Sequence, residues 1–383
     1  MVDWGKCSNF VGGKEKNNTM NRIILVGNGF DLAHGLKTKY EDFINWYFEQ
    51  LKKTLAYCNY TNSEDGLCKL HVDVAKIGAI SWRDFLRPHI HNIFKMSVDE
   101  FLNYIDYHRK QGNIKVEFSS LLKRISKAIS IKGWVDIEAD YYELLKDCPD
   151  LNENVVADLQ QSLKYLQGKL AEYLLCVQDS ATDNINVAIS EIINEPILGR
   201  DISQYALKHI INSEEDRIYP LEESLILDFN YTHTTDLYHN NVIHIHGKLD
   251  SPKSIIFGYG DDLDEYYKKL SNLNDNRYLT NIKSIRYLES GNYRDMLRFI
   301  NAAPYQIYIM GHSCGNSDRT LLNTLFEHEN CVSIKPFYYQ KDEENDNYSE
   351  ITQNISRNFT DMQSFRDKVV NKTLCVPMPQ LQI

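Results

Sequence analysis

The sequence predicts an α/β fold with a mostly parallel sheet and a large α-helical insertion after the first strand, loop and helix. Two observations predict it. The apolar run Ile23–Val26 ends directly in a glycine, and after Pro220 short apolar runs alternate with helical patterns. Strands that alternate with helices are typical of parallel sheets. The residues between these two parts show helical spacing, so we expect them to interrupt one sheet domain.

The first elements are a strand, a glycine-rich turn and a helix. Residues 1–19 are polar, and we expect them to form a flexible N-terminal extension. Ile23–Val26 is continuous and rich in β-branched residues, which is typical of a strand buried on both faces. The residues around Asp31 can begin a helix.

Residues 44–219 are predicted to form the helical insertion. Residues 118–131 and 134–145 have amphipathic patterns, and spacings of three and four mark one helical face at Leu159, Leu163, Leu166, Leu170, Tyr173 and Leu174. We expect this insertion to form one wall of a cleft or an oligomer contact.

Residues 220–383 are expected to join residues 20–43 in one α/β nucleotide-binding domain. The predicted strands are Leu225–Phe229, Asn241–Ile245, Ser254–Phe257, Gln306–Met310 and Cys331–Tyr339, and the predicted helices are Tyr293–Ala303 and Arg319–Glu329.

Composition narrows the class of protein. The chain has 383 residues, a net charge of −11 and eight cysteines without a Cys-x-x-Cys pair. The acidic balance disfavours nucleic-acid binding, which rests on clustered Lys and Arg. No apolar stretch is long enough for a membrane span, and the first twenty residues are not signal-like. We therefore expect a cytoplasmic protein with reduced thiols.

The first candidate site is the loop after the first strand, Gly27-Asn28-Gly29-Phe30-Asp31, with Gly35 close behind. Glycines let the backbone approach a pyrophosphate, and a helix N-terminus supplies unpaired N–H groups. The loop lacks the third glycine of the dinucleotide fingerprint and the Lys-Ser/Thr of a P-loop. The alternative interpretation is a tight turn with Asp31 as the helix N-cap.

Asn230 and His246 each follow a predicted strand. Asn230 could orient a water or a ribose hydroxyl, although Asn is also a common turn residue. His246, followed by Gly247, could act as a general base. His244 shares its strand face, but no third metal ligand follows at a recognisable spacing, so we expect a core role for His244 and no metal.

Gly311-His312-Ser313 follows the predicted strand 306–310 and could hold a phosphate or ribose through backbone amides and the Ser hydroxyl. We expect Asp318 to be the N-cap of the next helix. A serine hydrolase is not expected, because His312 stands where the nucleophile elbow has Ser. All these candidates lie at strand ends, where open α/β sheets bind ligands, and together they predict a nucleotide site.

The motifs resemble those of the phage abortive-infection AbiH family over about residues 21–335. The motifs that carry this resemblance are Gly27–Leu36 with Thr38, Tyr40 and Asp42-Phe43, Trp134-x-Asp136-x-Glu138, Phe229–Thr232, His244-x-His246-Gly247 and Gly311-His312-Ser313.

AbiH proteins are in turn similar to a remote branch of the sirtuin-like, Rossmann-like NAD-binding fold. That similarity implies NAD binding by Gly27, Asn28, Gly29, Phe30, Gly35, Gly247, Gly311, His312 and Ser313. It implies a ribose- and water-orienting role for Asn230 and a general-base role for His246. The four-cysteine zinc module of sirtuins is absent from the sequence, so a protein deacylase is not expected.

The activity that the resemblance implies is hydrolysis of NAD to nicotinamide and ADP-ribose, with NAD as substrate and no metal. Asp31 could steady the positive charge that develops on the ribose. A toxic enzyme must be held inactive, so we expect an unidentified phage trigger, and a homo-oligomer is compatible with the sequence. The alternatives are a nucleotide-binding sensor or interaction module without turnover, and a metal-dependent nuclease that uses His244 and His246, which the acidic charge disfavours.

Overall fold

The computed structural model describes residues 19–132, 136–150, 154–180, 184–212 and 214–381. The predicted extension, except Thr19, and Trp134 of the Trp134-x-Asp136-x-Glu138 motif lie outside the described residues.

The centre of the fold is a parallel sheet of five strands in the order β10-β9-β1-β7-β8. All four pairings between neighbouring strands are parallel, which confirms the predicted α/β class with a mostly parallel sheet. The strands are β1 (Met20–Val26), β7 (Leu221–Asp228), β8 (Val242–His244), β9 (Tyr305–Met310) and β10 (Cys331–Phe337).

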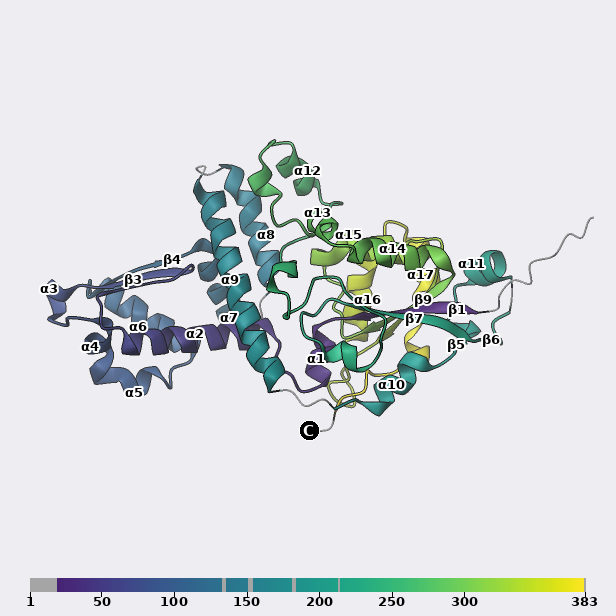
Figure 1. The fold of residues 1–383 in the computed structure, drawn as a ribbon, viewed down its shortest axis with the longest axis horizontal. Coiled ribbons are helices and arrows are strands. Elements are labelled where there is room, and N and C mark those ends of the chain that lie inside the picture. Colours follow the sequence, from purple (N-terminus) through teal and green to yellow (C-terminus); the bar gives the residue numbers. More distant parts are fainter. Residues whose placement is uncertain (1–18, 133–135, 151–153, 181–183, 213, 382–383) are drawn as a thin grey trace, which may run out of the picture.

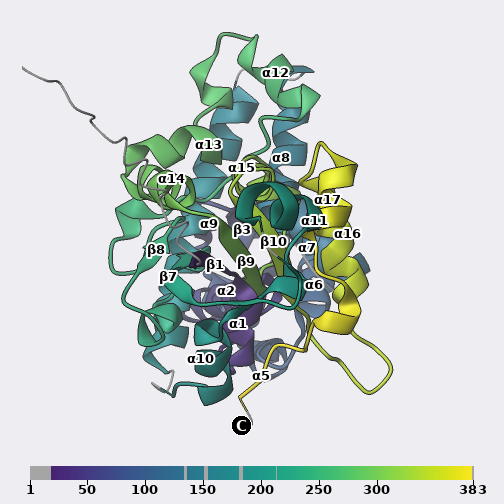
Figure 2. The same cartoon turned by 90° about the vertical axis from the view of Figure 1, so that its right-hand side faces the viewer.

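Helices cover both faces of this sheet (Figures 1 and 2). One face packs against α14 (Asn292–Ala302), α15 (Arg319–Phe326) and α16 (Tyr348–Arg357), and the other packs against α1 (Asn28–Ala33) and α10 (Val187–Asn194). β1 is buried along its whole length, as its continuous apolar run predicts. The shorter helices of this part are α11 (Gln204–Ala206), α12 (Glu265–Ser271), α13 (Lys283–Arg286) and α17 (Met362–Lys368).

The chain leaves the sheet after β1 and builds a largely helical arm that extends to the left in Figure 1. Its longer helices are α2 (Tyr40–Tyr57), α6 (Val98–Lys110), α7 (Ser120–Lys132), α8 (Ile137–Asp147) and α9 (Asn154–Asp179), and its shorter ones are α3 (Val74–Ile77), α4 (Trp82–Leu86) and α5 (Ile90–Ile93). They share one apolar core, to which α9 contributes the predicted face from Leu159 to Leu174.

The predicted helical insertion also contains strands that the prediction missed. β2 (Asn62–Glu64), β3 (Cys68–Val72) and β4 (Ile114–Phe118) form a three-stranded antiparallel sheet in the arm. β5 (Ile197–Leu198) pairs with β6 (Ile218–Tyr219) beside the parallel sheet, where Ile197 and Tyr219 pack with Met20 and Val332. These strands have two to five residues, so they give little periodic signal within a long helical region.

The last part of the predicted insertion, residues 44–219, does not belong to the arm. Ile189 and Ile193 of α10 pack on the parallel sheet and not on the core of the arm.

The predicted strand Ser254–Phe257 was wrong. Residues 255–257 have irregular backbone, although all three side chains are buried. Ile255 and Phe257 belong to the core of the arm, whereas Ile256 belongs to the core of the sheet. The apolar run therefore reflects contact with two cores, which produces the same pattern as a buried strand.

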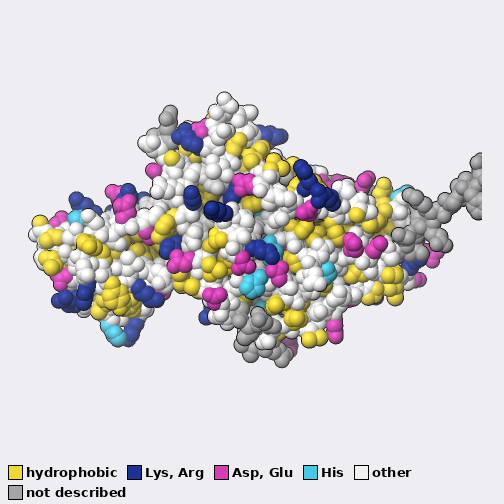
Figure 3. Space-filling view, viewed as in Figure 1, with side chains coloured by type: hydrophobic (Ala, Val, Ile, Leu, Met, Phe, Trp, Pro, Cys, Tyr) yellow, Lys and Arg dark blue, Asp and Glu magenta, His cyan; other side chains and the backbone are white. Residues whose placement is uncertain are grey.

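The surface carries charges of both signs. On the face shown in Figure 3, Lys and Arg are interspersed with Asp and Glu. None of the helices in the described ranges is long and apolar enough to cross a membrane.

Candidate active site at the carboxyl edge of the sheet

The strand order reverses beside β1. The chain runs from β1 to β7 and β8 on one side, and β9 and β10 occupy the other side. Open α/β sheets bind ligands at such a switch point, outside the carboxyl ends of the strands. The loops after β1 and β9 meet there, where the Gly29 N–H donates to the Gly311 carbonyl oxygen at 2.8 Å.

The close approach of these loops requires glycine on both sides. A Cβ on Gly29 would lie 2.8 Å from the Gly311 Cα, and a Cβ on Gly311 would overlap the backbone nitrogen of Phe30. Gly311 also has a φ of +75°, a left-handed conformation that glycine adopts without steric cost.

A cavity of about 400 Å³ opens at this point. Among the predicted residues, it is lined by Gly27, Asn28, Gly29, Asp31, Asn230, His246, Gly311, His312 and Ser313. The structure therefore brings together the four motifs that the sequence placed at separate strand ends. Asp136 and Glu138, at the start of α8, belong to the arm and line the same cavity.

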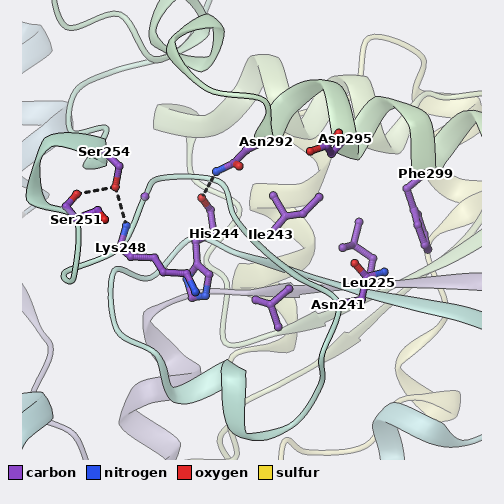
Figure 4. A pocket seen from close by; sticks show the side chains of 12 residues that line it. Leu225, Asn241, Ile243, His244, Lys248, Ser251, Ser254, Asn292, Asp295 and Phe299 are labelled. Atoms are coloured by element: carbon purple, nitrogen blue, oxygen red, sulfur yellow. Dashed lines mark hydrogen bonds between the residues drawn. The ribbon is translucent and has the colours of Figure 1, made fainter.

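Three predicted ligand-binding residues do not line this cavity. Phe30 is buried in the sheet core and packs against the rings of His34 and Tyr238. Gly35 follows α1 with a φ of +79° and serves the turn there. Gly247 lines a neighbouring cavity of about 520 Å³ with Lys248, close to the sheet edge (Figure 4).

Asp31 is buried inside α1, whose N-cap position is held by Gly27, so the alternative of Asp31 as N-cap was wrong. Its Oδ2 accepts a hydrogen bond from Thr232 Oγ1 at 2.7 Å, whereas its Oδ1 has no hydrogen-bond partner among the described residues. Burial raises the pKa of Asp31 to about 6. The unpaired oxygen suits a hydrogen-bond donor on a ligand.

Asn230 is fixed beside the glycine loop. Its Nδ2 donates to the Gly27 carbonyl oxygen at 3.1 Å, and its backbone N–H donates to Asp228 Oδ1 at 2.8 Å. Asp228 is fully buried and accepts a second hydrogen bond from Thr235. These contacts hold the Asn230 side chain in place before any ligand binds.

The rings of His246 and His312 both contact the Phe229 ring, and both histidines are buried. His246 Nε2 lies 3.2 Å from Tyr287 Oη and 3.2 Å from Asp318 Oδ1. His312 Nδ1 accepts from the Cys314 N–H at 3.0 Å, so neutral His312 carries its proton on Nε2. Burial lowers the pKa of His312 to about 4, which keeps it neutral at pH 7.

The sequence prediction missed the ion-pair cluster behind these histidines. Lys283, which is 0% exposed, places its Nζ 2.9 Å from both Glu138 Oε2 and Asp318 Oδ1. Asp318 occupies the N-cap position of α15, as predicted, but its side chain makes no capping hydrogen bond and pairs with Lys283 instead. Of the three residues in this cluster, Glu138 had a sequence signal in the Asp136-x-Glu138 motif, Asp318 was expected only as an N-cap, and Lys283 had no signal.

The cavity is acidic. Its lining includes the carboxyl groups of Asp31, Asp136, Glu138 and Asp318, and Lys283 lies behind them. Burial raises the pKa of Glu138 and Asp136, because the charged carboxylates lose hydration. The aromatic rings of Tyr40, Phe229 and Tyr231 complete the lining. This combination of carboxylates and aromatic faces favours a positively charged group on the ligand.

A second cavity, of about 740 Å³, lies on the other side of the two glycine loops. It shares Gly29, Gly311, His312 and Ser313 with the first. It adds the charged residues Lys39 and Glu350 and a set of apolar and amide side chains that includes Leu32, Phe337, Ile351, Met378, Asn347 and Asn354. The two cavities thus meet at the crossing of the loops.

His244 does not line this cavity. It is buried, and its Nε2 lies 2.9 Å from Asp236 Oδ1. Within the part of the chain that the structure describes, no group of three or more His, Cys, Asp or Glu residues could hold a metal ion, and the seven described cysteines are free.

A family model described as "Bacteriophage abortive infection AbiH" matches residues 23–340. No curated protein and no solved structure matches the chain.

Proposed function

This chain belongs to the bacteriophage abortive infection AbiH family, and from that premise we propose that it defends the cell against phage by hydrolysing NAD to nicotinamide and ADP-ribose. We place the reaction in the acidic cavity at the switch point, and we relate the fold to a remote branch of the sirtuin-like NAD-binding proteins. The observation that carries the proposal is the pairing of this cavity with a second one across two glycine loops.

The paired cavities match the two halves of a dinucleotide. The nicotinamide ring of NAD is positively charged, which suits the cavity with four carboxyl groups. The adenosine half fits the larger cavity with its apolar and amide lining. The pyrophosphate would then cross the backbone of Gly29 and Gly311, which line both cavities, and Lys39 lines the larger one.

The chemistry follows from the groups in the acidic cavity. The bond between ribose C1′ and the ring nitrogen breaks, nicotinamide leaves as a neutral molecule, and the ribose develops oxocarbenium character. Carboxylates close to the ribose stabilise that positive charge, and Asp31 has a free oxygen for it. A water held by Asn230 attacks C1′, and His246 accepts the proton that the water loses.

The test is nicotinamide release by chromatography for wild type, Asn230→Ala and Lys248→Ala. Lys248 is the matched control, because it lies in the neighbouring cavity and pairs with Asp236. We expect a loss of at least 100-fold for Asn230→Ala, as for a group that orients the attacking water, and wild-type release for Lys248→Ala. Equal losses of nicotinamide release in both variants would refute the placement of the reaction in the acidic cavity.

One observation favours a second function, a nucleotide-binding module without turnover. His246 Nε2 already has two neighbours, Tyr287 and Asp318, within hydrogen-bond distance. In that case NAD would raise the melting temperature, because it binds only the folded state, and no nicotinamide would appear.

A further inference from the structure

Four buried side chains form a continuous polar chain along the wall of the acidic cavity, and three of them, Glu138, Asp318 and His246, line it. Glu138 comes from the arm, Lys283 from α13, Asp318 from the start of α15, and His246 from the loop after β8. The links are 2.9 Å from Glu138 to Lys283, 2.9 Å from Lys283 to Asp318 and 3.2 Å from Asp318 to His246. All four side chains are at least 90% buried.

The charges in this chain make each member depend on the next. A buried ammonium group is strongly unfavourable unless it is paired, and Lys283 has two carboxylates in contact. Burial alone would raise the pKa of Asp318, but Lys283, His246 and His312 lower it well below its ordinary value. Asp318 is therefore a carboxylate whose charge is secured by Lys283.

That carboxylate faces both histidines of the cavity. Its Oδ1 lies beside His246 Nε2, and its Oδ2 lies 3.8 Å from His312 Nε2. A carboxylate next to an imidazole nitrogen favours a proton on that nitrogen, and so it selects the tautomer of the neutral ring.

We propose that Asp318 is a positioning residue for His246: it orients the ring through Nε2, favours a proton on that nitrogen, and stabilises the imidazolium after proton transfer. Lys283 and Glu138 act through Asp318 by keeping it charged and in place. This inference rests on the proposed function, since it gives His246 the role of base.

The arm takes part in this arrangement. Glu138 Oε1 accepts the Gly258 N–H at 3.0 Å while Oε2 pairs with Lys283. The carboxylate thereby joins the arm to the loop 255–260 and to the polar chain behind His246. A displacement of α8 would remove one of the two anions that compensate Lys283.

The first experiment measures NAD hydrolysis by Asp318→Asn beside a matched control, Asp201→Asn. Asp201 pairs with Lys335 at 2.8 Å and is as buried as Asp318, but it does not line either cavity. We expect kcat to fall at least tenfold for Asp318→Asn with KM changed less than threefold. We also expect the acidic limb of its pH–rate profile to move down by about 1 unit, because an imidazole that loses a neighbouring carboxylate has a lower pKa.

The pH–rate profile reports the pKa of His246 as it is influenced by the titratable and charged groups around it, which are Asp318, Lys283, His312, Glu138, Tyr231 and Tyr287. The control Asp201→Asn should lower thermal stability by a similar amount with wild-type kcat and the wild-type pH profile. Equal loss of kcat in both variants, or a wild-type profile for Asp318→Asn, would overturn the positioning role.

A second measurement does not depend on turnover or on any variant at position 318. The ¹⁵N and ¹³C NMR signals of the His246 ring, assigned by their loss in His246→Gln, report which ring nitrogen carries the proton. The wild-type protein should show the Nε2–H tautomer; the Nδ1–H tautomer would refute the inference. If wild-type protein released no nicotinamide, the proposed function would fail, while the NMR result would still decide the role of Asp318.

Discussion

The substitution Gly311→Ala tests the crossing of the two loops that builds the site. Gly311 has a φ of +75°, a conformation that costs Ala about 1–2 kcal/mol. The added Cβ would also overlap the backbone nitrogen of Phe30 and lie 2.9 Å from the Gly29 Cα. Backbone atoms cannot rotate away as a side chain can, so this overpacking adds about 1–3 kcal/mol. We expect a loss of about 2–5 kcal/mol in the free energy of unfolding.

The assay is urea denaturation of wild type, Gly311→Ala and a control, Gly168→Ala. Gly168 lies within α9, and apart from the neighbouring backbone of that helix nothing lies within 4 Å of a Cβ built there. An Ala at that helical position should stabilise the protein by about 1 kcal/mol. If Gly311→Ala were as stable as wild type, the loops after β1 and β9 would not meet as described, and the reasoning about the site would be refuted.

Three further changes have defined outcomes. Burial raises the pKa of Asp31 from an ordinary 3.8 to about 6, so the folded state binds the carboxyl proton more tightly than the unfolded state does. The protonated carboxyl therefore adds to the free energy of unfolding below about pH 4, and this stabilisation is lost as the pH rises through 6. In wild-type protein the free energy of unfolding should therefore fall by up to about 3 kcal/mol between pH 4 and pH 7, and in Asp31→Asn this fall should be absent; urea denaturation at both pH values measures it. The same fall in Asp31→Asn as in wild type would contradict the burial of this carboxyl. Lys283→Met should lower the free energy of unfolding by about 3–5 kcal/mol, because two buried carboxylates lose their counter-ion, and a neutral result would show that the cluster is hydrated. Tyr287→Phe should leave the fold intact in circular dichroism and change the NMR shift of His246, since it removes the hydroxyl 3.2 Å from Nε2; an unchanged shift would argue against this contact.

The parallel sheet and most of the cavity lining could be predicted, because they depend on local patterns. Ile23–Val26 is continuous and apolar, and glycine or polar residues follow at the strand end. In a parallel sheet all such ends meet at one edge, so separate motifs such as those of Asn230 and Gly311 converge without any knowledge of side-chain contacts.

The ion-pair cluster could not be predicted in this way. Lys283 lies 145 residues from Glu138 and 35 from Asp318, and nothing around it in the sequence distinguishes a buried Lys from an exposed one. Asp318 stands directly before a helix, where the N-cap role is the common one, and only the tertiary fold turns its side chain towards Lys283. The predicted strand at residues 254–257 was wrong for a related reason, since the apolar side chains there are buried by contact with two cores and not by strand pairing.

The central claim is that the acidic cavity hydrolyses NAD, and the most direct measurement is nicotinamide release from NAD by purified wild-type protein beside His246→Ala, with and without a chelator. We expect wild-type protein to release nicotinamide equally with and without the chelator, and we expect His246→Ala to abolish the release. Release that persists in His246→Ala, or that the chelator stops, would contradict it, and NAD-dependent stabilisation without any release would identify a binding module instead.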